Sequence, residues 1–210
     1  MLAKPSKVAK VENHPAVALN DVAAWFADLQ KREGMGARAL EFLAMTAARS
    51  GEVRGATWDE IDMDAGLWVI SADRMKMDRE HRVALTQEAM DLLTSLPRFE
   101  GSPFVFPAAR GGQISDMTIS AVMRRQGFKD PRVGRTAVPH GIRSTFRDWA
   151  AERTEYPSDM AEIAMAHRVG SEVERAYRRG DMIEKRRAMM ADWGCFLRGE
   201  QNAAIVRLRR

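Results

Sequence analysis

The sequence predicts a mainly helical α+β fold with one small antiparallel sheet, and two observations lead to this prediction. Beyond Thr86, most segments have the apolar spacing of helices, and proline or glycine separates each from the next. Before Thr86, residues 67–70 and 81–85 are short runs typical of neighbouring strands. Because 45% of the 210 residues are hydrophobic, the chain can form one compact domain.

The N-terminal part is expected to be an arm followed by helices. Residues 1–18 contain two prolines and no helical period, which indicates an arm or a linker remnant. The domain is expected to cover residues 19–210. Asn20 can cap a helix whose buried face would carry Val22, Trp25, Phe26 and Leu29. A second helix is expected over residues 37–48, and Ser50 is a plausible N-cap for a short helix that runs to Trp58.

The two expected strands are joined by a charged connection. Residues 71–80 contain Arg74, Lys76 and Arg79, so this connection is predicted to face solvent as a loop or hairpin tip.

The rest of the chain is predicted to be helical up to Leu197. Asp181 and Glu184 have the spacing of a capping box at the start of the last helix. The run from Glu184 to Arg187 is interpreted as a solvated helix face. The expected helices cover residues 87–96, 116–126, 141–152, 159–166 and 182–197.

Composition and charge limit the function classes. Lys and Arg number 33 against 29 acidic residues, for a net charge of +4, and this modest excess permits a nucleic-acid partner without requiring one. The single Cys195 excludes an internal disulfide framework and a cysteine-rich zinc site. Neither a membrane-spanning apolar run nor a secretory segment is found, so a bacterial cytoplasm is the expected location.

Common cofactor motifs give little signal. There is no Walker A loop, no metalloprotease helix and no paired Cys-x-x-Cys. Residues 34–39 match a loose dinucleotide fingerprint, but they follow a helical segment where that motif requires a strand. A turn between two helices is the better interpretation.

His140 and Arg143 are the first candidates for chemistry. At positions i and i+3 they share one face of a helix. A guanidinium offers a planar fork of donors to phosphate oxygens, and an imidazole can donate a hydrogen bond or transfer a proton. The pair alone is a weak signal, because such spacing often arises by chance.

Further residues in order along the chain strengthen the signal. Arg49 is followed by Gly51-Glu52 and by Trp58-Asp59-Glu60-Ile61-Asp62, Lys76 stands in Arg74-Met75-Lys76-Met77, and Tyr177 comes ten residues after His167. From about His14 to Leu197 the chain resembles the tyrosine recombinase, or phage integrase, family, and most closely its prophage integrases.

The resemblance implies the tyrosine-recombinase catalytic fold and a way to cut and rejoin DNA. Tyr177 would be the nucleophile that forms a 3′-phosphotyrosyl bond, and a phenol reaches its anionic form more readily than Ser or Thr. Arg49 and Arg143 would clamp the phosphate oxygens. Because the phosphotyrosine stores the energy of the broken bond, no metal, ATP or other cofactor is expected.

The remaining roles also follow from the resemblance. Lys76 is the candidate general acid for the 5′ hydroxyl, and His140 and His167 would assist by hydrogen bonding or proton transfer. Glu52 would orient Arg49 or a neighbouring group. Contacts to the DNA backbone are possible for Arg74, Arg79 and Arg147, and a salt bridge is the alternative for Arg147.

The resemblance further implies double-stranded DNA with a crossover site as partner, assembly into a synaptic tetramer, and a place at the bacterial nucleoid. Family integrases also carry an arm-binding region and a core-binding domain, so the chain is expected to be an isolated catalytic domain. Four residues of the last helix could contact a neighbouring subunit or pack in the core: Met189, Met190, Trp193 and Phe196. The alternative functions are a type IB topoisomerase and a DNA-binding module without catalytic activity.

Overall fold

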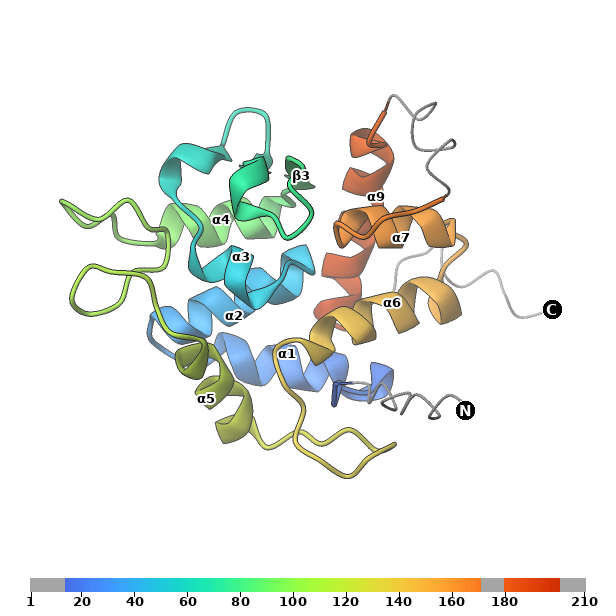
Figure 1. The fold of residues 1–210 in the computed structure, drawn as a ribbon. Helices are drawn as coiled ribbons and strands as arrows, with labels where there is room; N and C mark the ends of the chain where they lie inside the picture. The colour runs from blue at the N-terminus through green and yellow to red at the C-terminus, as the bar shows by residue number, and fades with distance from the viewer. Residues whose placement is uncertain (1–13, 171–179, 201–210) are drawn as a thin grey trace, which may run out of the picture.

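The computed structural model describes residues 14–170 and 180–200. Helix α2 (Met35–Thr46) lies at the centre, and helices pack on several of its sides (Figure 1). It contacts α1 (Val22–Gln30), α3 (Ser50–Arg54), α5 (Asp116–Gln126) and two further helices described below. This position explains why ten of its twelve residues are buried, which is the pattern of a helix inside a core.

The sheet has three antiparallel strands in the order β1-β2-β3. The predicted strands are β2 (Leu67–Ile70) and β3 (His81–Ala84), and their register pairs Leu67 with Ala84 and Ile70 with His81. The sequence interpretation missed β1 (Ile61–Asp62), which is two residues long and follows the short 3₁₀ helix Trp58–Glu60. A second 3₁₀ helix, Ala72–Arg74, opens the connection between β2 and β3.

The helices predicted after Thr86 are present. They are α4 (Gln87–Ser95), which contacts α2, then α5, α6 (Gly141–Arg153), α7 (Ser158–Ala164) and α9 (Ile183–Leu197). Helix α9 runs beside α6 and α7 (Figure 1) and also contacts α1 and α2. Within the described residues, no helix is both long and apolar enough to cross a membrane.

Helix α9 packs into the core of its own domain. Met189, Met190 and Trp193 are fully buried, and the indole of Trp193 donates a hydrogen bond of 2.7 Å to the Ala44 carbonyl of α2. Phe196 is partly buried, and its ring stacks on Trp193. Of the two alternatives for these residues, the structure shows core packing.

Three local predictions around helix starts were wrong. Asn20 lies in a 3₁₀ turn (Leu19–Asp21) and accepts a hydrogen bond from Arg153 instead of capping α1. Ser50 is the first residue of α3, and Arg49 is its N-cap. Glu184 makes no capping box, because Met182 is the N-cap of α9 in a left-handed conformation.

The predicted solvated face of α9 also contains a buried charge. Arg186 is 2% exposed, and its guanidinium donates to the Arg82 carbonyl of β3 and to the backbone and side chain of Asp181. Packing against β3 therefore buries a residue whose charge suggested exposure.

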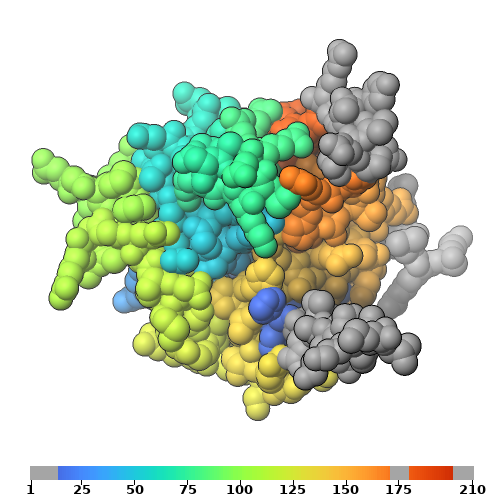
Figure 2. Space-filling view, in the orientation of Figure 1, coloured from blue at the N-terminus to red at the C-terminus, as the bar shows by residue number. Residues whose placement is uncertain are grey.

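Residues 14–18, from the end of the expected arm, pack against the domain. Ala16 and Val17 are buried, and the Ala16 amide donates to the buried carboxylate of Asp130. The Pro15 carbonyl accepts a hydrogen bond from Val138, just before α6. Figure 2 shows these first described residues in blue against the yellow and gold surface of the segment that leads into α6.

Candidate active site

The first arginine stands where α2 gives way to α3. Ala47, at the C-terminal end of α2, has a left-handed φ of 51°, so the chain turns sharply toward Arg49. The Arg49 side chain donates to Glu52 Oε1 at 2.6 Å, and its amide donates to Glu52 Oε2 at 2.8 Å. Glu52 is buried, so this carboxylate holds Arg49 by both its backbone and its guanidinium.

The second arginine, Arg143, reaches the same place from α6. Its side chain is 3% exposed and donates to the carbonyl of Ala47 at 2.5 Å and to that of Met165 at 2.8 Å. Both carbonyls stand at helix C-termini, of α2 and of α7, where carbonyl groups have no helical partner and the dipole favours a cation. The Ala166 carbonyl, at the same end of α7, accepts from Arg49 at 3.4 Å.

The two guanidinium groups create a positive site. Burial, and then the neighbouring charge of Arg49, lower the pKa of Arg143 to about 10, while Glu52 acts in the opposite direction. Arg143 therefore remains charged at neutral pH. An anion with several oxygens, such as a phosphodiester, would relieve the repulsion between the two cations and accept their hydrogen bonds.

His167 borders Arg143 at the end of α7. Ala166 has a left-handed φ of 55°, and the His167 amide donates to the Glu162 carbonyl at 2.9 Å, which is the backbone pattern of a Schellman turn. The ring nitrogen Nε2 lies 2.9 Å from the Arg143 guanidinium, and Nδ1 lies 2.6 Å from Glu162 Oε2.

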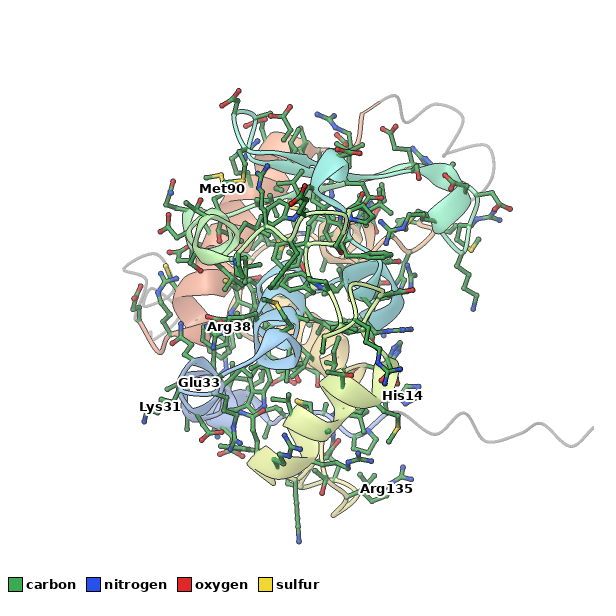
Figure 3. All side chains as sticks on the ribbon, turned by 90° about the vertical axis from the view of Figure 1, so that its left-hand side faces the viewer. His14, Lys31, Glu33, Arg38, Met90 and Arg135 are labelled. Carbon is green, nitrogen blue, oxygen red and sulfur yellow. The ribbon has the colours of Figure 1, made fainter. Side chains whose placement is uncertain are left out.

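His140 is the N-cap residue of α6, one helical turn before Arg143. The residue is exposed, and its ring centroid lies 4.3 Å from that of His14. Partial desolvation of the ring lowers the pKa of His140, and the charges of the nearby His14 and Arg143 lower it further. Lys31 and Glu33 come just before the turn at Gly34. In Figure 3 these two residues lie on the opposite side of the molecule from His14. The loose dinucleotide motif is thus a helix-helix turn remote from this site.

The β2–β3 connection carries the candidate lysine. Lys76 is exposed there, as expected. The Arg74 side chain is held in place by an ion pair with Glu60 and by a hydrogen bond that it donates to the Glu52 carbonyl at 2.8 Å. Arg79 is exposed. Arg147 is exposed as well and forms an ion pair with Glu162 at 2.9 Å.

Direct contacts join Arg49 to Glu52 and Arg143 to His167, and backbone carbonyls at the ends of α2 and α7 hold the two pairs at one place. His140 precedes Arg143 by one turn of α6. Tyr177 lies outside the described residues. Within residues 14–170 and 180–200, no cluster of three or more His, Cys, Asp or Glu side chains could hold a metal ion.

Two neighbours of the site were missed by the sequence interpretation. Glu162 precedes His167 by five residues, a spacing that brings side chains together only because α7 ends between them. His14 comes from the expected arm, and neither helical period nor motif order connects it with His140. The Pro-Ala-Val run after His14 was the available signal, because an apolar run is unusual in a solvated arm.

The family model and the related sequences that match this chain point to the same family. Residues 19–183 match the model of the phage integrase family. The chain is 36% identical to prophage integrase IntA of Escherichia coli K12 over 77% of the chain and 38% of that protein. It spans between 38% and 51% of the length of the curated relatives compared.

Solved structures give the same fold at low sequence identity. The integrase of transposon Tn1549, in complex with transposon right end DNA, has a TM-score of 0.60 and 14% identity, covering 87% of this chain and 67% of the solved one. A lambda integrase tetramer bound to a Holliday junction has a TM-score of 0.57 and 16% identity, covering 81% of this chain and 50% of the solved one. The expected fold, that of a tyrosine recombinase catalytic domain, is therefore confirmed.

Proposed function

Since the chain belongs to the phage integrase family, we propose that it is the catalytic domain of a site-specific DNA recombinase. It cuts and rejoins double-stranded DNA through a covalent 3′-phosphotyrosyl intermediate. The observation that carries this proposal is the pairing of Arg49 and Arg143 at one site, where two helix ends and the buried Glu52 orient their donors.

The two arginines act on the phosphate. Three contacts of the Arg143 side chain occupy three of its five N–H donors, so its orientation is set before DNA binds. The donors that remain free on the two preorganised guanidinium groups stabilise the charge that develops on the non-bridging oxygens, and each contributes roughly 3 kcal/mol when it behaves as an oxyanion-hole donor.

Tyr177 is the nucleophile in this proposal. Its phenol gives up its proton to one of the two histidines, and the phenol oxygen forms a bond to phosphorus. The bond from phosphorus to the 5′ oxygen breaks, and Lys76 gives that oxygen a proton. Attack by the 5′ hydroxyl of a partner strand reverses these steps and releases the tyrosine. His140 and His167 assist by hydrogen bonding to the phosphate or by proton transfer.

The other tyrosine of the chain supports this choice. The chain has two tyrosines, and the Tyr156 hydroxyl donates a 2.6 Å hydrogen bond to Asp192. Burial and this carboxylate raise the pKa of Tyr156, so it is poorly suited to become a phenolate. Tyr177 is left as the candidate.

The partners in this proposal are DNA and further copies of the chain. Tn1549 integrase is known with DNA and lambda integrase as a tetramer on a Holliday junction, which supports a synaptic tetramer for this chain. Since the substrate is chromosomal or phage DNA, the site of action is the bacterial nucleoid.

A nicked suicide substrate tests the proposal. We would fuse the chain behind the core-binding domain of a family member and add that member's crossover site as a nicked duplex. Wild type is expected to form an adduct that survives denaturing electrophoresis, and Tyr177→Phe none, because the nucleophilic oxygen is missing.

Tyr156→Phe is the matched control. It removes the hydroxyl that donates to Asp192 and is expected to keep the adduct. Absence of an adduct with wild type, or its persistence in Tyr177→Phe, would overturn the proposal. Relaxation of plasmids that lack a crossover site would instead favour a topoisomerase.

A further inference from the structure

Glu162 contacts both His167 and Arg147 through its carboxylate. Glu162 Oε2 lies 2.6 Å from His167 Nδ1, and Glu162 Oε1 lies 2.9 Å from Arg147 Nε. The Glu162 carbonyl also accepts the His167 amide at 2.9 Å. Backbone and side chain therefore join the same two residues.

The partners of the ring determine its protonation. A guanidinium has donors only, so the 2.9 Å contact from Arg143 requires Nε2 of a neutral ring to be the acceptor. The proton of that ring is then on Nδ1, and it is donated to the Glu162 carboxylate. No other neutral arrangement satisfies both contacts.

Glu162 is itself held in place. Its side chain is 25% exposed, less than the 40% of His167 and the 68% of Arg147. With one oxygen on Arg147 and the other on His167, the carboxylate cannot rotate without losing a charge-assisted hydrogen bond.

We propose that Glu162 is a positioning residue, which fixes His167 in the Nδ1–H tautomer and directs Nε2 toward Arg143 and the phosphate site. The part of this inference that concerns DNA cleavage rests on the proposed function. The part that concerns the tautomer stands on the geometry of the chain alone.

The carboxylate serves both protonation states of the ring. In the neutral ring it keeps Nε2 free of hydrogen, so that this nitrogen can take a proton at the phosphate. When Nε2 is protonated and donates to a phosphate oxygen, the negative charge of Glu162 stabilises the imidazolium.

Nitrogen-15 NMR of the chain without DNA tests the tautomer. The chain has four histidines, and His167→Gln identifies the signals of His167. Near neutral pH, wild type is expected to show the pattern of a ring protonated at Nδ1. Protonation at Nε2 would overturn the proposal.

Variants of Glu162 test its role. Glu162→Ala is expected to raise the share of the Nε2–H tautomer of His167, because only the Arg143 contact then favours Nδ1–H. Glu162→Gln is expected to keep more of the Nδ1–H form, because its amide oxygen can still accept. The rate of adduct formation is expected to fall at least roughly tenfold in Glu162→Ala, which is the typical loss when a carboxylate that orients a functional histidine is removed. A smaller fall is expected in Glu162→Gln.

Glu152→Gln is the matched control, because Glu152 is an exposed carboxylate of the neighbouring α6. It is expected to change neither the tautomer nor the rate. An unchanged tautomer in both Glu162 variants would overturn the proposal, and Glu162→Gln addresses this even if Glu162→Ala fails to fold. If the tautomer shifts as expected but wild type forms no adduct, the proposed function fails and the role of Glu162 stands.

Discussion

Backbone carbonyls orient the arginines of the candidate site as much as carboxylates do. Arg143 is directed by the carbonyls of Ala47 and Met165, and Arg49 by that of Ala166 together with Glu52. These contacts use the planar fork of donors of a guanidinium, which the single ammonium of lysine cannot reproduce. The identity of these residues therefore depends on geometry as well as charge.

Arg74 and Arg79 differ in their surroundings, and this difference predicts different roles. Arg74→Ala removes an ion pair with the half-buried Glu60 and a hydrogen bond to the Glu52 carbonyl. We expect the free energy of unfolding, measured by urea denaturation, to fall by about 2 kcal/mol, because a hydrogen bond to a charged group is lost and Glu60 loses its cationic partner.

Arg79→Ala serves as the comparison, since Arg79 is exposed on the same connection. Its stability is expected to stay within about 0.5 kcal/mol of wild type. If Arg79 contacts the DNA backbone, the slope of log affinity against log salt concentration falls by about 1. A large stability loss in Arg79→Ala, or none in Arg74→Ala, would contradict this division.

The sequence could predict the residue types of the site but not all their partners. Arg49, Arg143 and His167 have side chains suited to a phosphate, and their order along the chain is informative. The carbonyls of Ala47 and Met165 carry no side-chain signal, because any residue at a helix end offers the same group.

At the scale of elements, the start of α6 depends on a close crossing of two segments. A Cβ at position 141 would lie 2.0 Å from the Pro15 carbonyl oxygen, so only glycine allows residues 14–18 to pass over this helix. The same crossing places His14 beside His140, and Thr145 donates to the Val17 carbonyl.

Gly141→Ala tests this crossing. Alanine in an exposed helix would be favoured by about 1 kcal/mol over glycine, but here backbone atoms must move to admit the methyl group. We expect the free energy of unfolding to fall by roughly 2 kcal/mol. Hydrogen exchange of the Val138 amide, which donates to Pro15, is expected to become faster.

Gly112→Ala is the control for this substitution, because a Cβ at position 112 meets nothing within 4 Å. Its stability and the exchange of Val138 are expected to match wild type. A Gly141→Ala protein as stable as wild type, with unchanged exchange, would show that the two segments are not in tight contact.

Helices were easier to predict than their ends. The span of α5 matched the expected residues because Ser115 caps its start and Gly127, with a φ of 74°, ends it. The start of α9 did not, because Asp181 pairs with Arg186 and Arg82 instead of closing a capping box. Such pairs come from tertiary packing, which a local pattern does not contain.

Over the whole molecule, a few buried polar contacts join parts that are distant in sequence. His81 Nε2 on β3 lies 3.1 Å from the Ala164 carbonyl of α7, and Trp193 of α9 donates to Ala44 of α2. The sequence indicates that these residues are in or near the core but not which element each one meets. Hydrophobic burial is non-directional, so the pairing is decided only when all elements pack together.

The contact of His81 predicts how the stability of the whole domain depends on pH. Burial, and then the charge of Arg186, lower the pKa of His81 from 6.5 to about 4, although Glu52 acts in the opposite direction. As the pH falls from 6.5 to 4, the unfolded chain takes up a proton that the folded chain refuses, so stability is complete above 6.5 and is lost toward 4. Between pH 7.5 and 5 the protonation of this histidine in the unfolded chain is expected to lower the free energy of unfolding by about 2 kcal/mol.

His81→Gln tests this prediction. Its side chain can still donate to the Ala164 carbonyl but does not titrate, so its urea midpoint is expected to change less between pH 7.5 and 5 than that of wild type. Equal acid sensitivity of the two proteins would mean that folding does not lower the pKa of His81, and the prediction would be wrong.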